Sequence, residues 1–192
     1  KRLGVKDERG KLFFEMCRIL REKQPKCFIA ENVKGLLTAN KRSAFPLIME
    51  EFEKSGYDVT YSILNSAEYG VPQKRERVII VGFRKDLGIK FTFPDIALKE
   101  EELHEPLSSV IENTVDEKYF FSERAVAGMM RNRKSMNKGR AQDVLKPCNT
   151  VGAHLAKVSL NSTDPVLMIG ERYRRFTPRE VARIQSFPED FK

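Results

Sequence analysis

The sequence of 192 residues lacks tryptophan, has few cysteines and contains no long apolar run. The cysteines are odd in number and none stands in a CxxC spacing, which disfavours a disulfide framework or a zinc site; they are Cys17, Cys27 and Cys148. Such cysteine usage is typical of a reducing compartment. No apolar run reaches the length of a membrane-spanning helix, and the first residues show no signal-peptide pattern. The sequence therefore predicts a soluble globular protein of a reducing compartment.

The charge of the chain is positive and unevenly distributed. The formal net charge is +8 and the pI is about 9.4. Residues 99–117 hold seven acidic side chains and one lysine, so the rest of the chain is more basic than the total indicates. Positive charge held in patches fits a polyanionic partner such as nucleic acid. A solvated lysine-rich surface explains the same charge, and composition alone leaves both explanations open.

Hydrophobic periodicity predicts an α/β architecture in the first half of the chain. Apolar residues at helical spacing predict amphipathic helices over residues 10–23 and 43–55, which end near Pro25 and at Gly56. Apolar and β-branched runs predict strands at residues 27–31, 57–65 and 77–83. The order helix, strand, helix, strand, strand indicates part of an α/β sheet with helices on its faces.

The pattern changes after Arg84. Residues 85–146 combine an acidic stretch, a basic stretch and few clear periods, which indicates a smaller, irregular second module. Strand-like segments resume at CNTVGA and PVLMIG. Further on, Thr177, Pro178 and Glu180 occupy the N-cap, N1 and N3 positions of a predicted helix, the signature of a capping box with a proline start.

An acidic residue, Glu31, follows the apolar run of the segment CFIAENVKG. Ligands of open α/β sheets bind beyond the carboxyl ends of the strands, and Glu31 and Asn32 are predicted to lie at such an end. A partly desolvated carboxyl group there can donate or share a proton with a bound group. The alternative is that Glu31 is a solvated strand-end charge or a helix cap, and from this segment alone that alternative is the commoner one.

A second polar pattern occurs in YGVPQKRERVIIVGFR, where Gln73, Arg75 and Arg77 alternate as the chain enters a predicted strand. With a period of two residues, Arg75 and Arg77 point to the same side. Two neighbouring guanidinium groups suit a phosphate or a base edge. A pair of surface arginines at the start of a strand is the structural alternative.

ENVKG followed by YGVPQKRERVIIVGFR resembles the cytosine-5 DNA methyltransferase family of bacterial restriction-modification systems. KRLGVKDERGKLFFEMCRIL resembles the family segment after the catalytic Pro-Cys loop, and RYRRFTPREVARIQSFPEDF resembles the helix motif near the family's C-terminus. The resemblance covers nearly the whole chain, in family order. It implies an α/β fold with part of a Rossmann-like S-adenosylmethionine-dependent methyltransferase sheet and a small irregular target-recognition domain.

The resemblance also implies how the chain is divided and what it binds. Residues 1–84 would form part of the catalytic domain, with residues 170–192 packing back on it, and residues 85–169 would form the target-recognition domain. The implied partner is double-stranded DNA and the implied cofactor is S-adenosylmethionine. The implied location is the bacterial cytoplasm, at the nucleoid, with no membrane partner.

Individual roles follow from the family motifs. Glu31 would bind N3 and the exocyclic amine of a flipped cytosine, Asn32 would fix the nucleophile loop, and Arg77 would hold the base and orient Glu31. Arg75 would face phosphate or the thiol loop, and Leu12 would contact the cofactor. The expected DNA-binding residues are Arg2 and Arg9 in a mobile loop, Gln73, and, in the basic stretch 131–146, Arg131, Arg133, Lys134, Lys138 and Arg140.

Four family motifs do not occur in this sequence: the glycine-rich cofactor loop, the acidic cofactor contact that follows it, the Pro-Cys-Gln nucleophile and the closing Gly-Asn motif. The chain is therefore expected to be the C-terminal part of such an enzyme, a fragment or a split subunit. Alone it would be inactive, pairing with an N-terminal partner or with itself. The alternatives are a non-catalytic DNA-binding subunit and a tRNA cytosine-5 methyltransferase.

One segment imitates the missing nucleophile. Pro147-Cys148-Asn149 looks like Pro-Cys-Gln, but it follows the Glu-Asn-Val segment, whereas the family's nucleophile precedes it. Cys148 is therefore expected to be structural. Cys17, on an amphipathic helix, and Cys27, at the start of a strand, are expected in the core.

Overall fold

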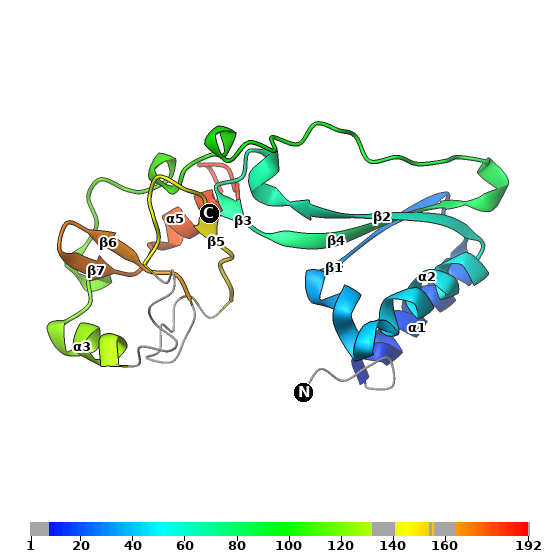
Figure 1. Ribbon diagram of the computed structural model, residues 1–192, viewed down its shortest axis with the longest axis horizontal. Helices are drawn as coiled ribbons and strands as arrows, with labels where there is room; N and C mark the ends of the chain where they lie inside the picture. Colours follow the sequence, from blue (N-terminus) through cyan, green and yellow to red (C-terminus); the bar gives the residue numbers. More distant parts are fainter. Residues whose placement is uncertain (1–7, 132–140, 154, 156–163, 192) are drawn as a thin grey trace. The chain divides into compact units, whose positions relative to one another are not determined.

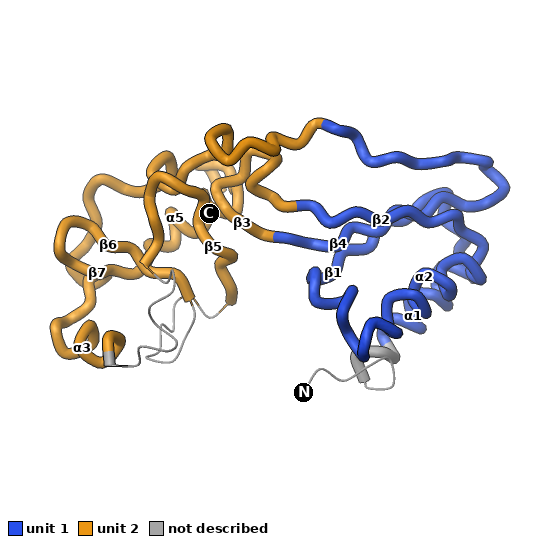
Figure 2. Tube along the Cα trace, viewed as in Figure 1, with its two compact units in different colours: residues 1–64, 76–95 blue, residues 65–75, 96–192 orange. Residues whose placement is uncertain are grey.

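The computed structural model describes residues 8–131, 141–153, 155 and 164–191, which fold into helices, short 3-10 turns and three small sheets (Figure 1). The side chains of residues 8–11 and 131 lie outside this description. The chain divides into two compact units, residues 1–64 with 76–95 and residues 65–75 with 96–192 (Figure 2). The predicted catalytic and target-recognition domains stay predictions, because compactness alone assigns no function.

The first unit is built on a three-stranded sheet. Its strands are β1 (Cys27–Val33), β2 (Tyr57–Asn65) and β4 (Glu76–Arg84), in the order β1-β4-β2. The central strand β4 runs antiparallel to β1, with Glu31 opposite Ile79 and Val33 opposite Arg77. All three predicted strands are confirmed. β1 continues two residues beyond the predicted end, so Glu31 and Asn32 lie inside the strand and not past it.

The two predicted helices of this unit are also confirmed, as α1 (Glu8–Lys23) and α2 (Ala44–Lys54). Both lie on the same face of the sheet (Figure 1), because their apolar stripes join the core formed by alternate strand residues. A 3-10 segment, η1 (Lys34–Arg42), joins β1 to α2. The buried members of this core are Cys17, Leu20, Phe28, Phe45, Ile48, Phe52, Tyr57, Val78 and Ile80.

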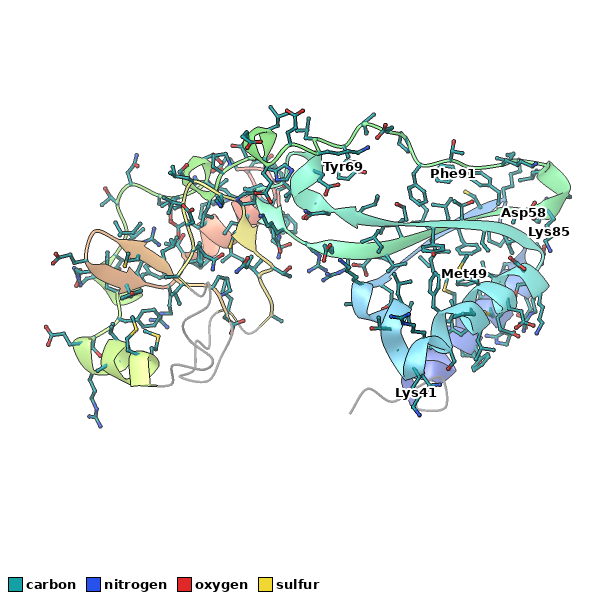
Figure 3. All side chains as sticks on the ribbon, viewed as in Figure 1. Lys41, Met49, Asp58, Tyr69, Lys85 and Phe91 are labelled. Carbon is teal, nitrogen blue, oxygen red and sulfur yellow. The ribbon has the colours of Figure 1, made fainter. Side chains whose placement is uncertain are left out.

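Aromatic packing fixes the centre of this core. The Phe28 ring lies 4.7 Å from Phe52 and 5.1 Å from Tyr57, centroid to centroid. Gly82 stands opposite Phe28 in the ladder, and a Cβ added there would come within 2.2 Å of the Phe28 ring, so only glycine fits. On the other face of the sheet, Phe91 packs 6.0 Å from Phe83 (Figure 3).

The second unit contains two sheets of two strands each. β3 (Gln73–Lys74) runs parallel to β5 (Cys148–Asn149), and β6 (Leu167–Ile169) runs antiparallel to β7 (Arg172–Arg174). The helices are α3 (Glu123–Arg131) and α5 (Pro178–Ile184). Four 3-10 turns lie in its described residues: η2 (Ser66–Tyr69), η4 (Glu101–Leu103), η5 (Leu107–Ser109) and η6 (Glu117–Tyr119). A further turn, η3 (Lys85–Leu87), belongs to the first unit. Its buried core consists of Leu107, Cys148, Val151, Leu155, Leu167, Phe176 and Ile184.

The predicted capping box of α5 is confirmed. The Thr177 side chain accepts a hydrogen bond from the Glu180 backbone N–H at 3.1 Å, and the Glu180 carboxylate accepts one from the Thr177 N–H at 2.8 Å. The same carboxylate forms a buried, two-point ion pair with Arg174, at 2.7 and 2.8 Å. Glu180 therefore connects the helix start to β7 without leaving a buried charge unpaired.

Two negative findings apply to the described residues alone. None of their helices has the length and apolar content to cross a membrane. They also contain no cluster of three or more histidine, cysteine or acidic side chains arranged to hold a metal ion.

Candidate functional site

Glu31 and Arg77 meet on one face of the first unit's sheet. Along β1, Phe28 and Ala30 face the helices, so Ile29 and Glu31, which alternate with them, point to the opposite face. Arg77 Nε donates to Glu31 Oε1 at 2.7 Å. Arg77 stands opposite Val33, so this ion pair is a diagonal contact between neighbouring antiparallel strands.

The Arg77 side chain is held at a second point. Its Nη1 donates to the backbone carbonyl of Glu76 at 2.8 Å. A guanidinium is planar and rigid, so two contacts at different nitrogens fix its plane as well as its position. The Arg77 side chain is 19% exposed while that of Glu31 is 50% exposed, so the arginine is the anchored member and the carboxylate is the accessible one.

Apolar side chains surround this ion pair. Ile29 and Val33 flank Glu31 on the same face of β1 and are 72% and 53% exposed. Ile79 and Val81 stand opposite Glu31 and Ile29 on β4. A carboxylate and a guanidinium on an apolar floor interact more strongly with a bound polar group than they would in open water, because fewer waters compete.

The structure places the other predicted catalytic residues differently. Asn32 is exposed, and its Oδ1 accepts a hydrogen bond from the Val33 N–H at 2.9 Å. Arg75 lies between β3 and β4, with its backbone bonded to Asn65 and Ser66. Arg75 is thus assigned to neither strand, and the prediction that Arg75 and Arg77 point to the same side stays a prediction.

Gln73 also departs from its predicted role as a DNA-binding residue. Its side chain is 1% exposed. Its Oε1 accepts from the Val151 N–H at 3.1 Å, and its Nε2 donates to the Ile184 carbonyl at 3.4 Å. The amide group is thus occupied inside the second unit, where it connects β3 to α5, and is not presented to a ligand.

The structure describes some of the residues predicted to contact the cofactor or DNA, and not others. Leu12 lies on α1 and is 71% exposed, as a residue that contacts a ligand would be. Arg9 and Arg131 lie in α1 and α3, but their side chains fall outside the described residues. The remaining predicted DNA contacts lie wholly outside the described residues: Arg2, Arg133, Lys134, Lys138 and Arg140.

The three cysteines are free, and they differ in burial. Cys148 is 0% exposed, and burial raises the pKa of its thiol to about 12. Cys17 is also buried, and burial raises the pKa of that thiol too. These positions fit the predicted structural roles, because a buried thiol in apolar surroundings carries little thiolate. The prediction that Cys27 lies in the core is wrong, since its side chain is exposed.

Two ion pairs hold the helix α5. Arg183 pairs with Glu189, at 2.7 Å, and Glu180 pairs with Arg174. The turn after the helix, where Ser186 adopts a positive φ of 61°, brings Glu189 back beside Arg183. No spacing rule for a straight helix predicts that contact.

One ion pair next to the site was not predicted from the sequence. Lys34 Nζ lies 2.7 Å from Glu76 Oε1, immediately beyond the Val33–Arg77 pair of the ladder. Forty-two residues separate the two side chains in sequence. The signal that could have found them is the strand register, which only the structure supplies.

Comparison with known proteins gives the class of this chain. A family model described as C-5 cytosine-specific DNA methylase matches residues 1–192, and the chain belongs to that family. The chain is 38% identical to the type II methyltransferase M.FnuDI of Fusobacterium nucleatum and 36% identical to the type II methyltransferase M.NgoPII of Neisseria gonorrhoeae. Each match covers 98% of this chain and 62% of the relative, so the chain spans about three fifths of their length.

Solved structures give the same fold. The crystal structure of the Dnmt2 methyltransferase from S. pombe matches with a TM-score of 0.72 and 18% identity, over 98% of this chain and 62% of that one. The methyltransferase EhMeth from Entamoeba histolytica matches with a TM-score of 0.71 and 18% identity, over 98% and 60%. Identities this low establish the methyltransferase fold and nothing more specific.

Proposed function

We propose that this chain is the base-binding part of a DNA cytosine-5 methyltransferase, which transfers a methyl group from S-adenosylmethionine to C5 of cytosine in duplex DNA. The observation that carries the proposal is the Glu31–Arg77 ion pair, half open to solvent on an apolar sheet face, in a chain whose whole length matches the family. The relatives are named type II methyltransferases, so a restriction-modification role in a bacterial cell, at the nucleoid, is part of the proposal.

The chemistry explains why an acid and an arginine are needed together. C5 of cytosine lies inside the duplex, so the base must be flipped out before it can react. A cysteine thiolate adds to C6 more readily when N3 of the ring is protonated or firmly hydrogen-bonded. Glu31 would supply that hydrogen bond or proton and would accept one from the exocyclic amine. Arg77 would keep the carboxyl group aimed at the base.

Several groups for this reaction would come from outside the chain. The nucleophile and the glycine-rich cofactor loop have no match in the sequence, so we propose that another segment or an N-terminal partner subunit supplies them, and that the chain alone is inactive. S-adenosylmethionine would supply the methyl group. From this chain, the exposed Leu12 fits a contact with the flat apolar face of that molecule. Most of the cofactor site would lie elsewhere.

Positively charged residues of this chain would bind the DNA. We propose that Arg2, Arg9 and Arg75 lie near the phosphates around the flipped base. We also propose that residues 85–169 form the target-recognition domain, with the basic stretch from Arg131 to Arg140 against the duplex. Contacts to phosphate would position the DNA, and a few contacts to base edges would select the target.

The proposal is tested by Glu31→Ala and Glu31→Gln in the complete methyltransferase, with Glu53→Ala, an exposed acid on α2, as the matched control. General acid catalysis contributes typically about 10²–10⁴-fold. Both Glu31 variants should therefore lose at least about 100-fold in turnover, while their Kd for duplex DNA stays within about threefold. The measurement is tritiated methyl transfer together with a DNA-binding titration. Normal turnover of Glu31→Ala would rule out the proposed role.

A further inference from the structure

The ion pair between Lys34 and Glu76 closes the end of the β1–β4 ladder beside the candidate site. Lys34 follows Val33 at the end of β1, and Glu76 is the first residue of β4. Their side chains are 52% and 48% exposed, and the Nζ to Oε1 distance is 2.7 Å. Exposed ion pairs of this kind contribute little to global stability. A role in the stability of the whole unit therefore does not explain this contact.

Glu76 is connected to the site through its backbone. Its carbonyl accepts the hydrogen bond from Arg77 Nη1 at 2.8 Å, and Arg77 Nε in turn bonds Glu31 at 2.7 Å. The chain of contacts is thus Lys34 to the Glu76 carboxylate, the Glu76 carbonyl to Arg77, and Arg77 to Glu31. Each link is 2.8 Å or shorter.

The position of Glu76 makes this link important. Its peptide lies at the point where the chain leaves the break at Arg75 and begins β4, and residues at strand ends are held by fewer ladder bonds than residues inside a strand. The Lys34 side chain, at the start of η1 directly after β1, holds Glu76 at this end of the ladder. If the peptide rotates, its carbonyl no longer faces Arg77, and the plane of the guanidinium changes.

We propose that Lys34 and Glu76 are positioning residues for the reaction: their ion pair holds the Glu76 carbonyl, which orients Arg77 and through it the carboxyl group of Glu31. This inference rests on the proposed function, because Glu31 must be the group that meets the base. Catalytic geometry is sensitive to displacements of about 1 Å, so loss of an anchor two contacts away affects turnover more than binding.

The main experiment uses Lys34→Ala and Glu76→Ala in the complete methyltransferase. Each should lower kcat about tenfold and leave KM for duplex DNA within about twofold. The charge-exchanged double variant Lys34→Glu/Glu76→Lys should recover most of the lost kcat, and Lys34→Arg should retain most of it. Lys54→Ala is the matched control, because Lys54 forms an equally exposed pair with Glu50 on α2, at 2.8 Å, away from the site.

Two other sets of results would overturn the inference. If Lys34 contacts a DNA phosphate instead, Lys34→Ala will raise KM and lower the salt dependence of binding by about one ion. Glu76→Ala will then be normal, and the charge exchange will make binding worse. Normal kcat in both single variants also overturns it. If Glu31→Ala keeps normal turnover, it is the proposed function that fails.

A second measurement needs no turnover. In this chain alone, the Arg77 Nε–H proton, bonded to Glu31, should give a resolved NMR signal that exchanges slowly with water. Lys34→Ala and Glu76→Ala should broaden that signal or shift it toward free arginine, whereas Lys54→Ala should not. An unchanged signal in both variants contradicts the positioning role, whatever the enzyme assay gives.

Discussion

Burial decides what each of the three cysteines can do. Cys148 is completely enclosed in the core of the second unit, and its thiol has a pKa of about 12, so at neutral pH it holds almost no thiolate. The segment Pro147-Cys148-Asn149 therefore resembles a nucleophile loop in its sequence, but its buried thiol is not available as a nucleophile. Cys27 is exposed, so it is the cysteine of the three that solvent reaches.

The raised pKa of Cys148 gives a prediction for alkaline pH. The folded-state pKa of about 12 lies above the ordinary value of 9.0, so the folded protein holds this proton more tightly than the unfolded chain. The stabilisation from the buried neutral thiol is complete below pH 9 and is lost as the pH rises toward 12. Relative to Cys148→Ala, the wild type should lose up to about 1.4 kcal/mol of unfolding free energy per pH unit in this window.

The measurement is urea unfolding of the wild type and of Cys148→Ala between pH 8 and 11. Cys27→Ala is the control for removing a cysteine, at a side chain that is exposed in the folded protein. A constant difference between the wild type and Cys148→Ala across the range would contradict the prediction.

At the residue scale, the family motifs selected candidate site residues but did not predict their contacts. Glu31 and Arg77 could be selected because the family motifs mark them, and their side chains do meet. The burial of Gln73 and the Lys34–Glu76 pair could not be predicted, because both depend on how strands distant in sequence align. A period-two pattern assumes a continuous strand, and Arg75 is assigned to neither β3 nor β4, so the pattern alone does not determine where its side chain points.

At the scale of elements, the length of a helix or strand decided how precisely its bounds could be predicted. The helices α1 and α2 and the strands β1, β2 and β4 are long enough to show a period, and their positions were predicted within about two residues. β3 and β5 have two residues each, and β6 and β7 have three. Such short strands show no period of their own, although β5 and β6 do fall inside the predicted strand-like segments CNTVGA and PVLMIG. Contacts with the rest of their unit determine them.

The segment η1 carries local strain that composition does not reveal. Asn40, Lys41 and Arg42 have φ values of 48°, 55° and 71°, so three consecutive residues with side chains adopt the left-handed region. Each such residue costs about 1–2 kcal/mol, although asparagine tolerates the region better than the others. The turn persists because Ser43 ties it, with its side chain donating to the Asn40 carbonyl at 2.7 Å.

Replacing the most extreme of these residues should stabilise the chain. In Arg42→Gly the left-handed conformation is no longer costly, while the unfolded chain gains freedom, so the net gain in unfolding free energy should be about 0.5–1 kcal/mol. Ala39→Gly is the control: Ala39 has an ordinary φ of −62°, so glycine there should destabilise. Chemical unfolding measures both. A destabilised Arg42→Gly would mean that the arginine side chain contributes more than the strain costs.

At the scale of the molecule, two hydrophobic cores coexist in one chain. The core of the first unit is built from α1, α2 and the three-stranded sheet, and that of the second from the loops around β5, β6 and α5. The two cores have no residue in common. The composition of the chain is compatible with one core or with one core and a smaller module. Composition does not reveal that the chain leaves the first unit at residue 65 and returns to it at residue 76.

Separate cores predict separate local stability. Phe52 is 1% exposed in the first core and Leu167 is 0% exposed in the second. Phe52→Ala should cost about 3–5 kcal/mol and Leu167→Ala about 2–5 kcal/mol, through lost burial and the cavity left behind. Hydrogen exchange followed by mass spectrometry should show faster exchange in α2, β1 and β4 for Phe52→Ala, with α5 and β6 unchanged, and the reverse for Leu167→Ala. If each substitution accelerates exchange equally in both units, the chain unfolds as one cooperative body and the two cores are energetically coupled.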